Sequence, residues 1–281
     1  METVQVGRSR AATVAFNLVG IAFAAVISFP VYWMINTALK PANEVLTLTP
    51  QLIPAHPTLA NFTSALHAPN FLADLRNSLV VTLGAVAGGL VVGFLGALAI
   101  ARFRFYGRRA LVLVILIVQM VPLLALLIPV FLTLNRFSMT DTLIGVILTY
   151  LILVLPYTVW MLRGFIIAVP RELDEAALID GCNRWQTFYR IILPLTGPGL
   201  VAASIYGFIQ TWNEFIIINV LNHSADKQNL MSWLASNQTL QETHWGPLMA
   251  GATLTSLPVV IFFLLIQRHV AAGLTAGAVK G

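Results

Sequence analysis

The sequence predicts an all-α integral membrane protein with six transmembrane helices and both termini in the cytoplasm. Of its 281 residues, 58% are hydrophobic and 10% are charged, whereas soluble domains carry about 25% charged residues. Six stretches approach or exceed the roughly 20 apolar residues that a helix needs to cross a bilayer. The segments between these stretches divide Lys and Arg unevenly, and this predicts the orientation.

In approximate numbers, the expected spans are 11–35, 77–101, 110–134, 142–162, 199–221 and 248–266. They leave a charged loop at 163–196, an outer loop at 222–247 and a tail at 267–281, all within one transmembrane domain of residues 1–281. The first stretch ends in Tyr32-Trp33-Met34 rather than in a small-residue cleavage site, so we expect a retained span and not a signal peptide.

The orientation follows from the basic residues. Twelve of the 16 Lys and Arg residues lie on one side of this arrangement and four on the other, which places both termini and the charged loop in the cytoplasm. This asymmetry accounts for the net charge of +5, so no nucleic-acid surface is inferred. Cys182 is the only cysteine, which excludes an intrachain disulfide and a thiol metal site, and we expect no metal.

Glycine and proline give the second, third and sixth spans their character. The second span has glycines at small-xxx-small spacing, such as Gly84 and Gly88, which allow helix backbones to approach closely. Pro122 and Pro129 in the third span and Pro258 in the sixth are expected to kink their helices. Such kinks suit a bundle around a pathway, but proline is also common in membrane helices generally.

The fifth span contains polar side chains at membrane depth. Glu214 lies ~22 Å along the helix from its start, and a carboxylate there costs about 2.5–3.5 kcal/mol on insertion scales. Two interpretations stay open: a carboxyl near the interface that bonds a neighbouring helix, or one that lines a translocation cavity or its outer gate. The candidate pathway-lining residues are Gln119, Gln210, Trp212, Asn213 and Glu214.

The outer segment 222–245 is polar but contains Trp233 and Trp245. Tryptophans embedded in a polar loop suit contact with another protein or with a sugar ring. They also favour the membrane interface, where Trp245 would act only as an anchor.

The charged loop is expected to form a helix, a turn and a second helix. Pro170 can open the first helix, and Glu172, Asp174 and Glu175 then complement its positive end. Gly181 is placed to adopt the left-handed conformation that ends it. Asn183 or Arg184 begins a second short helix through Ile191, and Pro194 stops it. An interfacial helix on the inner leaflet is the alternative, although anionic lipid would repel the acidic residues.

The same loop resembles a family signature. Glu175-Ala176-Ala177, Gly181, Ile191 and Leu193-Pro194 match E-A-A-x3-G-x9-I-x-L-P, which is typical of bacterial ATP-binding-cassette (ABC) importer permeases. The resemblance implies the type I importer permease fold and a coupling helix that docks on an ATPase subunit. The implied docking residues are Glu172, Glu175, Ala176, Ala177, Asp180, Gly181, Arg184, Trp185, Leu193 and Pro194.

Further positions resemble the carbohydrate importers of the maltose and glycerol-phosphate type, among them Lys40-Pro41, Asn77-Ser78 and Trp212-Asn213-Glu214-Phe215. The end of the chain resembles the tail of the smaller permease subunit, which reaches between two ATPase subunits. The implied tail contacts are Gly273, Leu274, Thr275, Ala276, Gly277 and Lys280. The outer segment corresponds to a scoop loop that enters the substrate-binding protein. Cys182 departs from the family, which often has alanine there.

By this resemblance the chain is a permease subunit of an ATP-driven importer for a sugar or sugar-like solute in the bacterial inner membrane. The implied partners are a second, different permease, two copies of an ATP-binding subunit, an extracytoplasmic sugar-binding protein and membrane lipid. No G-x-x-x-x-G-K-S/T motif occurs, so we expect no enzyme activity and no bound cofactor, with ATP and Mg on the partner ATPase.

Three other functions fit the sequence less well. An ion-gradient-driven transporter or channel would need several intramembrane acids or broken half-helices, whereas Glu214 is the one acid well inside a predicted span. An intramembrane enzyme would need a nucleophile and base in the spans, and none is evident. A receptor-like scaffold would explain the charged loop but not the tail and outer segment together.

Overall fold

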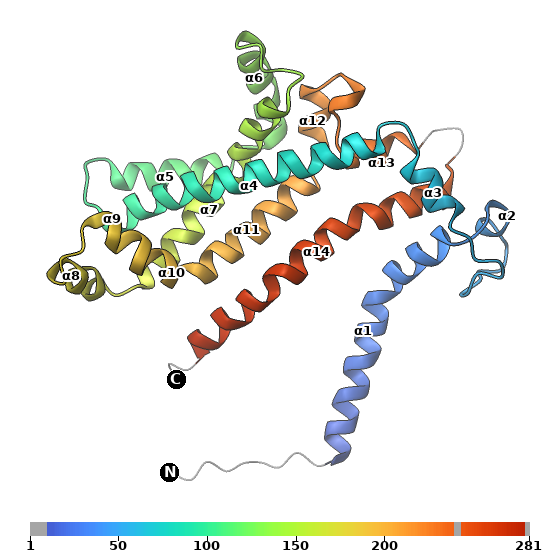
Figure 1. Ribbon diagram of the computed structural model, residues 1–281, viewed down its shortest axis with the longest axis horizontal. Helices are drawn as coiled ribbons and strands as arrows, with labels where there is room; N and C mark the ends of the chain where they lie inside the picture. Colours follow the sequence, from blue (N-terminus) through green and yellow to red (C-terminus); the bar gives the residue numbers. More distant parts are fainter. Residues whose placement is uncertain (1–9, 239–242, 279–281) are drawn as a thin grey trace. The chain divides into compact units, whose positions relative to one another are not determined.

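The computed structural model describes residues 10–238 and 243–278, and all regular elements in these ranges are helices (Figure 1). Within these described ranges, four helices are long and apolar enough to cross a membrane, and the number rises to six if each of two bent helix pairs is one span. The expectation of an all-helical membrane fold is thus confirmed. Contacts divide the chain into two compact units, one of residues 1–68 with 237–254 and one of residues 69–236 with 255–281.

The first unit contains α1 (Arg10–Ala38), α2 (Ala42–Val45), α3 (Ala60–Leu66) and the start of α14 (Trp245–Ala278). The apolar side chains of α1 are exposed over most of its length, as expected for a helix that faces lipid. Its end is fixed by polar contacts: Asn61 Nδ2 donates to the carbonyls of Ala38 and Lys40 at 2.9 and 2.8 Å. Lys40 is buried, and its Nζ donates to the Gln51 carbonyl at 2.8 Å.

The second unit is built on α4 (Phe71–Arg102), α7 (Leu143–Ala168) and α11 (Gly197–Trp212), which pack together (Figure 1). The glycines of α4 lie against α7. A Cβ at Gly89 would lie 2.9 Å from Val154 Cγ1, and one at Gly93 would lie 2.6 Å from Thr158 Cγ2. The glycine spacing therefore serves close packing of two helix backbones, as the sequence predicted.

Two buried clusters hold these helices together. The first joins α4 and α7 to α6 (Leu123–Arg136) and α12 (Ile216–Leu221), with Tyr150 fully buried in it. The second joins α4, α7 and α11 near the charged segment and includes Phe94, Leu162 and Ile192. The α4 members of the two clusters extend from Val81 to Ala101.

The structure divides the third predicted span. Residues 110–134 were expected as one kinked helix, but α5 (Arg108–Val118) and α6 are bent by 105° relative to each other. The break covers Gln119 to Pro122, where proline lacks the N–H that would continue the helix and takes an extended ψ of 127°. The predicted position of the kink is correct, but the helix does not continue through it.

The remaining elements are short and flank α11. Before it come α8 (Arg171–Ile179), α9 (Arg184–Thr187), the π-helical turn η1 (Phe188–Ile192) and α10 (Leu193–Leu195). The helix through Arg184–Leu195 is bent by 69° from α11. After α11 and α12 come η2 (Ala225–Lys227) and α13 (Leu230–Ser236), so the predicted span 199–221 is interrupted at residues 213–215.

Candidate functional site

The charged loop forms the expected helix, turn and helix. Two hydrogen bonds close α8 in the arrangement of a Schellman motif: Cys182 N donates to the Ala177 carbonyl at 2.9 Å, and Gly181 N to that of Leu178 at 3.2 Å. Gly181 has a φ of +83°, the left-handed conformation predicted for it. A Cβ at Gly181 would have nothing within 4 Å, so backbone conformation and not space favours glycine here.

The second helix begins as predicted and ends differently. Asn183 and Gln186 form a capping box, with each side chain accepting from the other's backbone N–H at 2.8–2.9 Å. Pro194, however, does not stop the helix, which continues to Leu195. The turn before it is π-helical, with Leu193 N donating to the Phe188 carbonyl, and this wider turn accommodates the donor that proline lacks.

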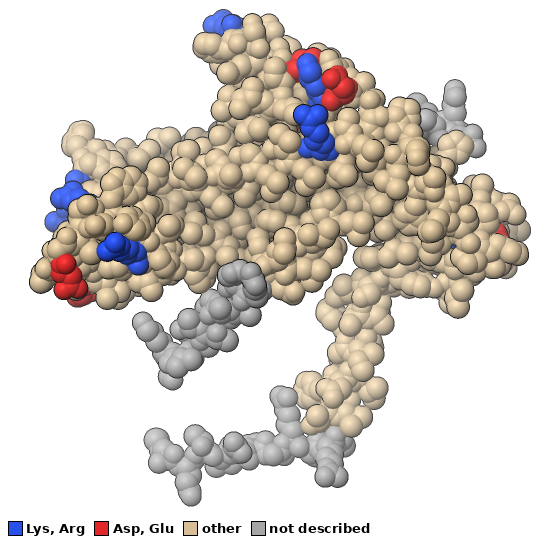
Figure 2. Space-filling model, in the orientation of Figure 1, with Lys and Arg blue, Asp and Glu red and all other residues tan. Residues whose placement is uncertain are grey.

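Most of the predicted docking residues are exposed. They gather where charged side chains of both signs meet at the end of the second unit that α8 and α9 form (Figure 2). Ala177 is the exception, since it is only 4% exposed and packs inward, and Leu193 is partly buried. The exposed residues are Glu172, Glu175, Ala176, Asp180, Gly181, Arg184, Trp185 and Pro194.

Asp174 lies on the inward side of α8, with its Oδ2 3.0 Å from Arg102 Nε at the end of α4. Burial raises the pKa of the Asp174 carboxyl, against the opposing effect of the Arg102 and Arg171 charges. The two residues line a cavity of about 270 Å³ together with Leu98, Phe103, Leu178, Arg184, Thr187, Phe188 and Ile192.

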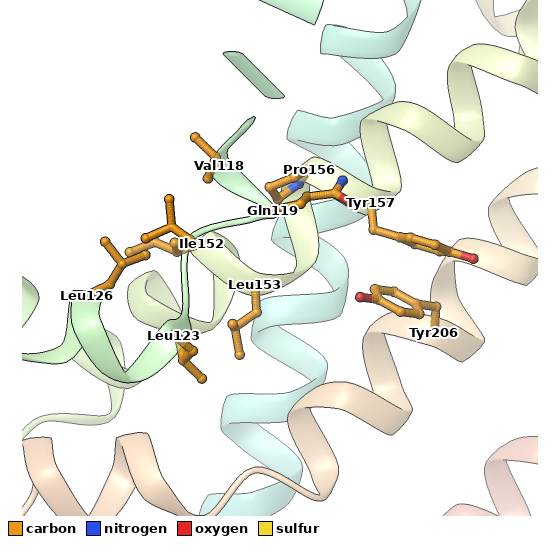
Figure 3. Close-up of a pocket in the computed structure, with 10 residues that line it drawn as sticks. Val118, Gln119, Leu123, Leu126, Ile152, Leu153, Pro156, Tyr157 and Tyr206 are labelled. Atoms are coloured by element: carbon orange, nitrogen blue, oxygen red, sulfur yellow. The ribbon is translucent and has the colours of Figure 1, made fainter. Parts of the chain in front are cut away.

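Gln119 borders a second cavity in this unit, of about 290 Å³ (Figure 3). Tyr157 of α7 and Tyr206 of α11 stack at its edge, with ring centroids 3.6 Å apart and planes 25° apart. The rest of the lining is mainly apolar, with Leu123, Ile152 and Pro156 among it. An amide beside two phenol rings is the kind of lining that orients a small polar ligand in an apolar site.

Glu214 lies in the break between α11 and α12, only 9% exposed. Tyr150 of α7 donates its hydroxyl to Glu214 Oε2 at 3.1 Å, and Ile217 N donates to Oε1 at 2.9 Å. The carboxyl thus bonds a neighbouring helix and caps the start of α12. These contacts fit the first of the two interpretations of Glu214, and a role in the pathway stays a prediction.

The other polar residues of the fifth span lie in different surroundings. Trp212 is 2% exposed and stacks on Phe208, which in turn stacks on Phe262 with centroids 4.0 Å apart. Trp212 is therefore buried beside an aromatic contact between α11 and α14, and it lines neither the cavity beside Gln119 nor the cavity beside Asp174. Gln210 and Asn213 are exposed.

The first half of the outer segment is folded onto α4. Asn77 Nδ2 donates to the carbonyls of Asp226 and Gln228 at 2.8 and 2.9 Å. Trp233, considered above as a contact for a partner or sugar, is 6% exposed and packs edge-on against Phe71 at 4.8 Å. Trp233 is therefore a core residue, although its neighbours in the sequence are polar. Trp245, in contrast, is 42% exposed.

Asp141 anchors the same segment. Its carboxylate accepts from His223 N, Ser224 N, the Ser224 hydroxyl and Lys227 Nζ at 2.5–3.1 Å. These hydrogen bonds, with that of the Ser224 hydroxyl foremost, hold the pKa of Asp141 well below its usual range. Ser78 of α4 also contributes, since its hydroxyl oxygen accepts from Leu230 N at 2.9 Å. We call the contacts of Asn77, Ser78 and Asp141 with residues 222–230 the outer attachment.

Sequence reasoning missed Tyr150, Tyr157 and Tyr206 as well as the contact of Arg102 with Asp174. Tyr150 and Tyr157 are seven residues apart, so the sequence indicates that they share one side of α7. It does not indicate their partners, Glu214 and Tyr206. In the predicted tail, Gly273, Leu274, Thr275, Ala276 and Gly277 lie within α14, and Lys280 lies outside the described residues.

Comparison with known proteins agrees with this architecture. Residues 68–276 match the family described as binding-protein-dependent transport system inner membrane component. The diacetylchitobiose uptake system permease protein DasC of Streptomyces coelicolor is 43% identical over 253 residues, 90% of this chain and 92% of its own. The trehalose transport system permease protein SugB of Mycobacterium tuberculosis is 34% identical over 256 residues, 90% and 92% of the two chains.

A solved structure supports the fold. A chain of a bacterial ABC transporter involved in the import of the acidic polysaccharide alginate superposes with a TM-score of 0.79 at 22% identity, over 92% of this chain and 98% of the other. The chain therefore belongs to the family of inner membrane components of binding-protein-dependent transport systems and has the fold of an ABC importer permease.

Proposed function

We propose that this chain is one permease subunit of an importer that takes up a sugar or sugar-like solute and is driven by a separate ATPase. The observation that supports this most directly is the exposed α8 with its Gly181 turn, a rigid element that presents acidic and small side chains. Such an element suits docking on a soluble protein. The family match favours this function over an ion-gradient-driven transporter or channel.

The proposed assembly contains a second, different permease, two ATP-binding subunits that hold ATP and Mg, and an extracytoplasmic binding protein. This chain would bind no cofactor and catalyse no reaction itself. Six spans, with each bent helix pair counted as one, and the uneven distribution of Lys and Arg support a cytoplasmic position for both termini and α8. Closure of the ATPase pair would displace α8 and rotate the attached helices as a rigid body.

The solute would pass the cavity beside Gln119, Tyr157 and Tyr206. Phenol faces and an amide are groups that can contact the apolar faces and hydroxyls of a sugar ring. The two relatives named above are permeases for diacetylchitobiose and trehalose, which supports a carbohydrate as the solute. Calorimetry of the cognate binding protein against a panel of sugars would identify it, and the absence of binding to any sugar would contradict the proposal.

The docking role is tested with Glu175→Lys in the assembled transporter. Reversing an exposed charge at the proposed interface should weaken co-purification of the ATPase while the affinity of the binding protein stays unchanged. The control is Arg136→Glu, which also reverses the charge of an exposed side chain but lies in α6, outside the proposed docking segment. Unchanged recovery of the ATPase with Glu175→Lys would remove the docking role.

The tail is tested by deleting Leu274 to Gly281. If it contacts the ATPase pair, the truncated protein should still insert in the membrane but lose control of ATP hydrolysis by substrate. Normal substrate-stimulated hydrolysis in the truncated complex would show that the tail has no such role.

A further inference from the structure

The end of α4 and the start of α8 hold each other through reciprocal contacts. Arg102, the last residue of α4, donates from Nη2 to the carbonyl of Val169 at 2.9 Å. Arg171, the first residue of α8, donates from Nη2 to the carbonyl of Ala101 at 3.3 Å. Each arginine thus binds a backbone carbonyl beside the other, and Ala101 offers one of the carbonyls that a helix end leaves without a partner.

A buried charge pair adds to these two hydrogen bonds. Arg102 Nε lies 3.0 Å from Asp174 Oδ2, and the two side chains are only 9% and 21% exposed. The pair joins the end of α4 to the middle of α8, one turn beyond Arg171. Removing one member of such a pair leaves the other charge buried without its counter-ion, which costs far more than the loss of an exposed pair. We call the contacts of Ala101, Arg102, Val169, Arg171 and Asp174 the inner attachment.

The inner attachment uses one side of α8 and leaves the other free. Glu172, Glu175 and Ala176 make none of these contacts and are exposed. At the α9 side, the guanidinium of Arg184 lies 5.9 Å from the Phe103 ring, which extends the contact beyond the Gly181 turn. α8 is therefore held to α4 through Arg171 and Asp174, while proposed docking residues such as Glu172 and Ala176 stay exposed.

α4 does not move independently of the bundle. Gly89 and Gly93 bring its backbone against α7 so closely that a methyl group at either would lie within 3 Å of a side chain. A displacement received by α8 is thus passed first to α4 and then to α7, through contacts that leave little room for slack.

We propose that Arg102 and Asp174 are positioning residues that fix α8 to α4, so that movement of the docked ATPase reaches the membrane helices. This inference rests on the proposed function, because it concerns the transmission of ATPase movement. It predicts that breaking the pair separates ATP hydrolysis from transport while leaving the docking face of α8 intact.

The test compares Arg102→Asp, Asp174→Arg and the double exchange in proteoliposomes that contain the whole transporter. Each single variant should retain the ATPase but lower the solute transported per ATP hydrolysed by about tenfold, and the double exchange should restore most of it. Arg104→Asp is the matched control, because Arg104 is exposed and lies two residues from Arg102. The substitution changes the charge of this loop by the same amount as Arg102→Asp. It should leave the ratio unchanged.

The outcomes separate the inference from the function on which it rests. If the pair had only a structural role, the single variants would lower the yield of complex but not the ratio of transport to hydrolysis, and this would overturn the inference. Failure of the double exchange to rescue would also overturn it. If the unaltered complex retained no ATPase, the proposed function itself would be wrong. For variants that assemble poorly, Asp174→Asn keeps the shape of the side chain and should still lower the ratio.

Discussion

The inner and outer attachments both tie a connecting segment to α4, but they do so with different chemistry. At the outer attachment, the Asp141 carboxylate receives four hydrogen bonds, and its pKa lies well below the usual range. At the inner attachment, Asp174 faces Arg102 through one oxygen, while its buried Oδ1 makes no hydrogen bond within the described residues, and its pKa is raised. A fully bonded carboxylate fixes a loop, whereas a partly bonded one tolerates rearrangement.

This difference suits the partners proposed for the two ends. The outer segment needs a fixed shape if it is to meet a binding protein repeatedly in one orientation. The inner segment must stay attached to α4 while a docked ATPase changes its arrangement.

Gly181→Asp should have the largest effect and should act on the inner end alone. An L-residue at the φ of +83° costs about 1–2 kcal/mol in backbone conformation, and a new charge would enter the docking face. We expect membrane insertion to be preserved and solute uptake by cells to fall below detection. Recovery of the ATPase with the purified variant should fall as well. Gly164→Ala is the control, because Gly164 also has open space around it but lacks the positive φ. Sustained uptake by Gly181→Asp would contradict the docking role.

Gly93→Ala should weaken both ends together because it separates α4 from α7. The added methyl group would lie 2.6 Å from Thr158 Cγ2, and overpacking of this kind costs about 1–3 kcal/mol. Thermal unfolding of the purified protein should show a lower midpoint. Gly96→Ala provides a control in the same helix, where the methyl group would lie an ordinary 3.5 Å from Val159 Cγ2. Equal midpoints for the two variants would show that α4 and α7 are not tightly packed.

Asp141→Ala should release the outer segment and leave the inner end unchanged. Backbone amides of residues 223–227 should exchange hydrogen about tenfold faster, because local opening then lacks the hydrogen bonds that oppose it. The amides of α8 serve as the internal control. If α8 exchanged faster to the same extent, the two attachments would not be independent.

Mild acidification should have the smallest effect and should distinguish the ends by their pKa values. Asp174 faces Arg102, Arg171 and Glu175, and its pKa is raised in the folded protein. The folded protein therefore binds this proton at a higher pH than the unfolded chain does, so protonation of Asp174 removes the ion pair without lowering the free energy of unfolding. The lowered pKa of Asp141 means that its contribution to stability persists until the pH falls below the usual aspartate value of about 3.9.

Hydrogen exchange across a pH series, corrected for intrinsic rates, checks this order. Exchange in α8 should change at a higher pH than exchange in residues 223–227. In Asp174→Asn the pH-dependent change of hydrogen exchange in α8 should disappear. If that change persisted, it would arise from a group other than Asp174.

The parts of the fold that sequence predicted are those set by local chemistry. Gly181 and the Asn183 cap follow from the conformations and hydrogen bonds available to those residues, and the position of the kink at Pro122 follows from a missing N–H. The sequence did not predict that the helix is interrupted at this kink. The prediction that Pro194 stops the helix is wrong because the π-helical turn before it accommodates the missing N–H. Trp233 was misjudged because its partner Phe71 is distant in sequence.

The candidate site was predictable to the same degree. The signature around Glu175 located the docking segment, but nothing local indicates that Arg102 meets Asp174 or that Tyr157 stacks on Tyr206. Such contacts depend on how α4, α7 and α11 pack, which a single sequence does not specify.

α4 runs from the outer to the inner attachment over ~37 Å between Asn77 and Arg102, and no proline interrupts it, in contrast to Pro156 in α7 and Pro258 in α14. One stiff helix that is bonded at both ends makes the two ends thermodynamically linked. In the proposed assembly, whatever factor a nucleotide-bound ATPase imposes on the affinity for the binding protein, the loaded binding protein must impose the same factor on the affinity for the ATPase. The chain would thus report the arrival of solute outside to the nucleotide site inside through the same helix that conveys movement outward.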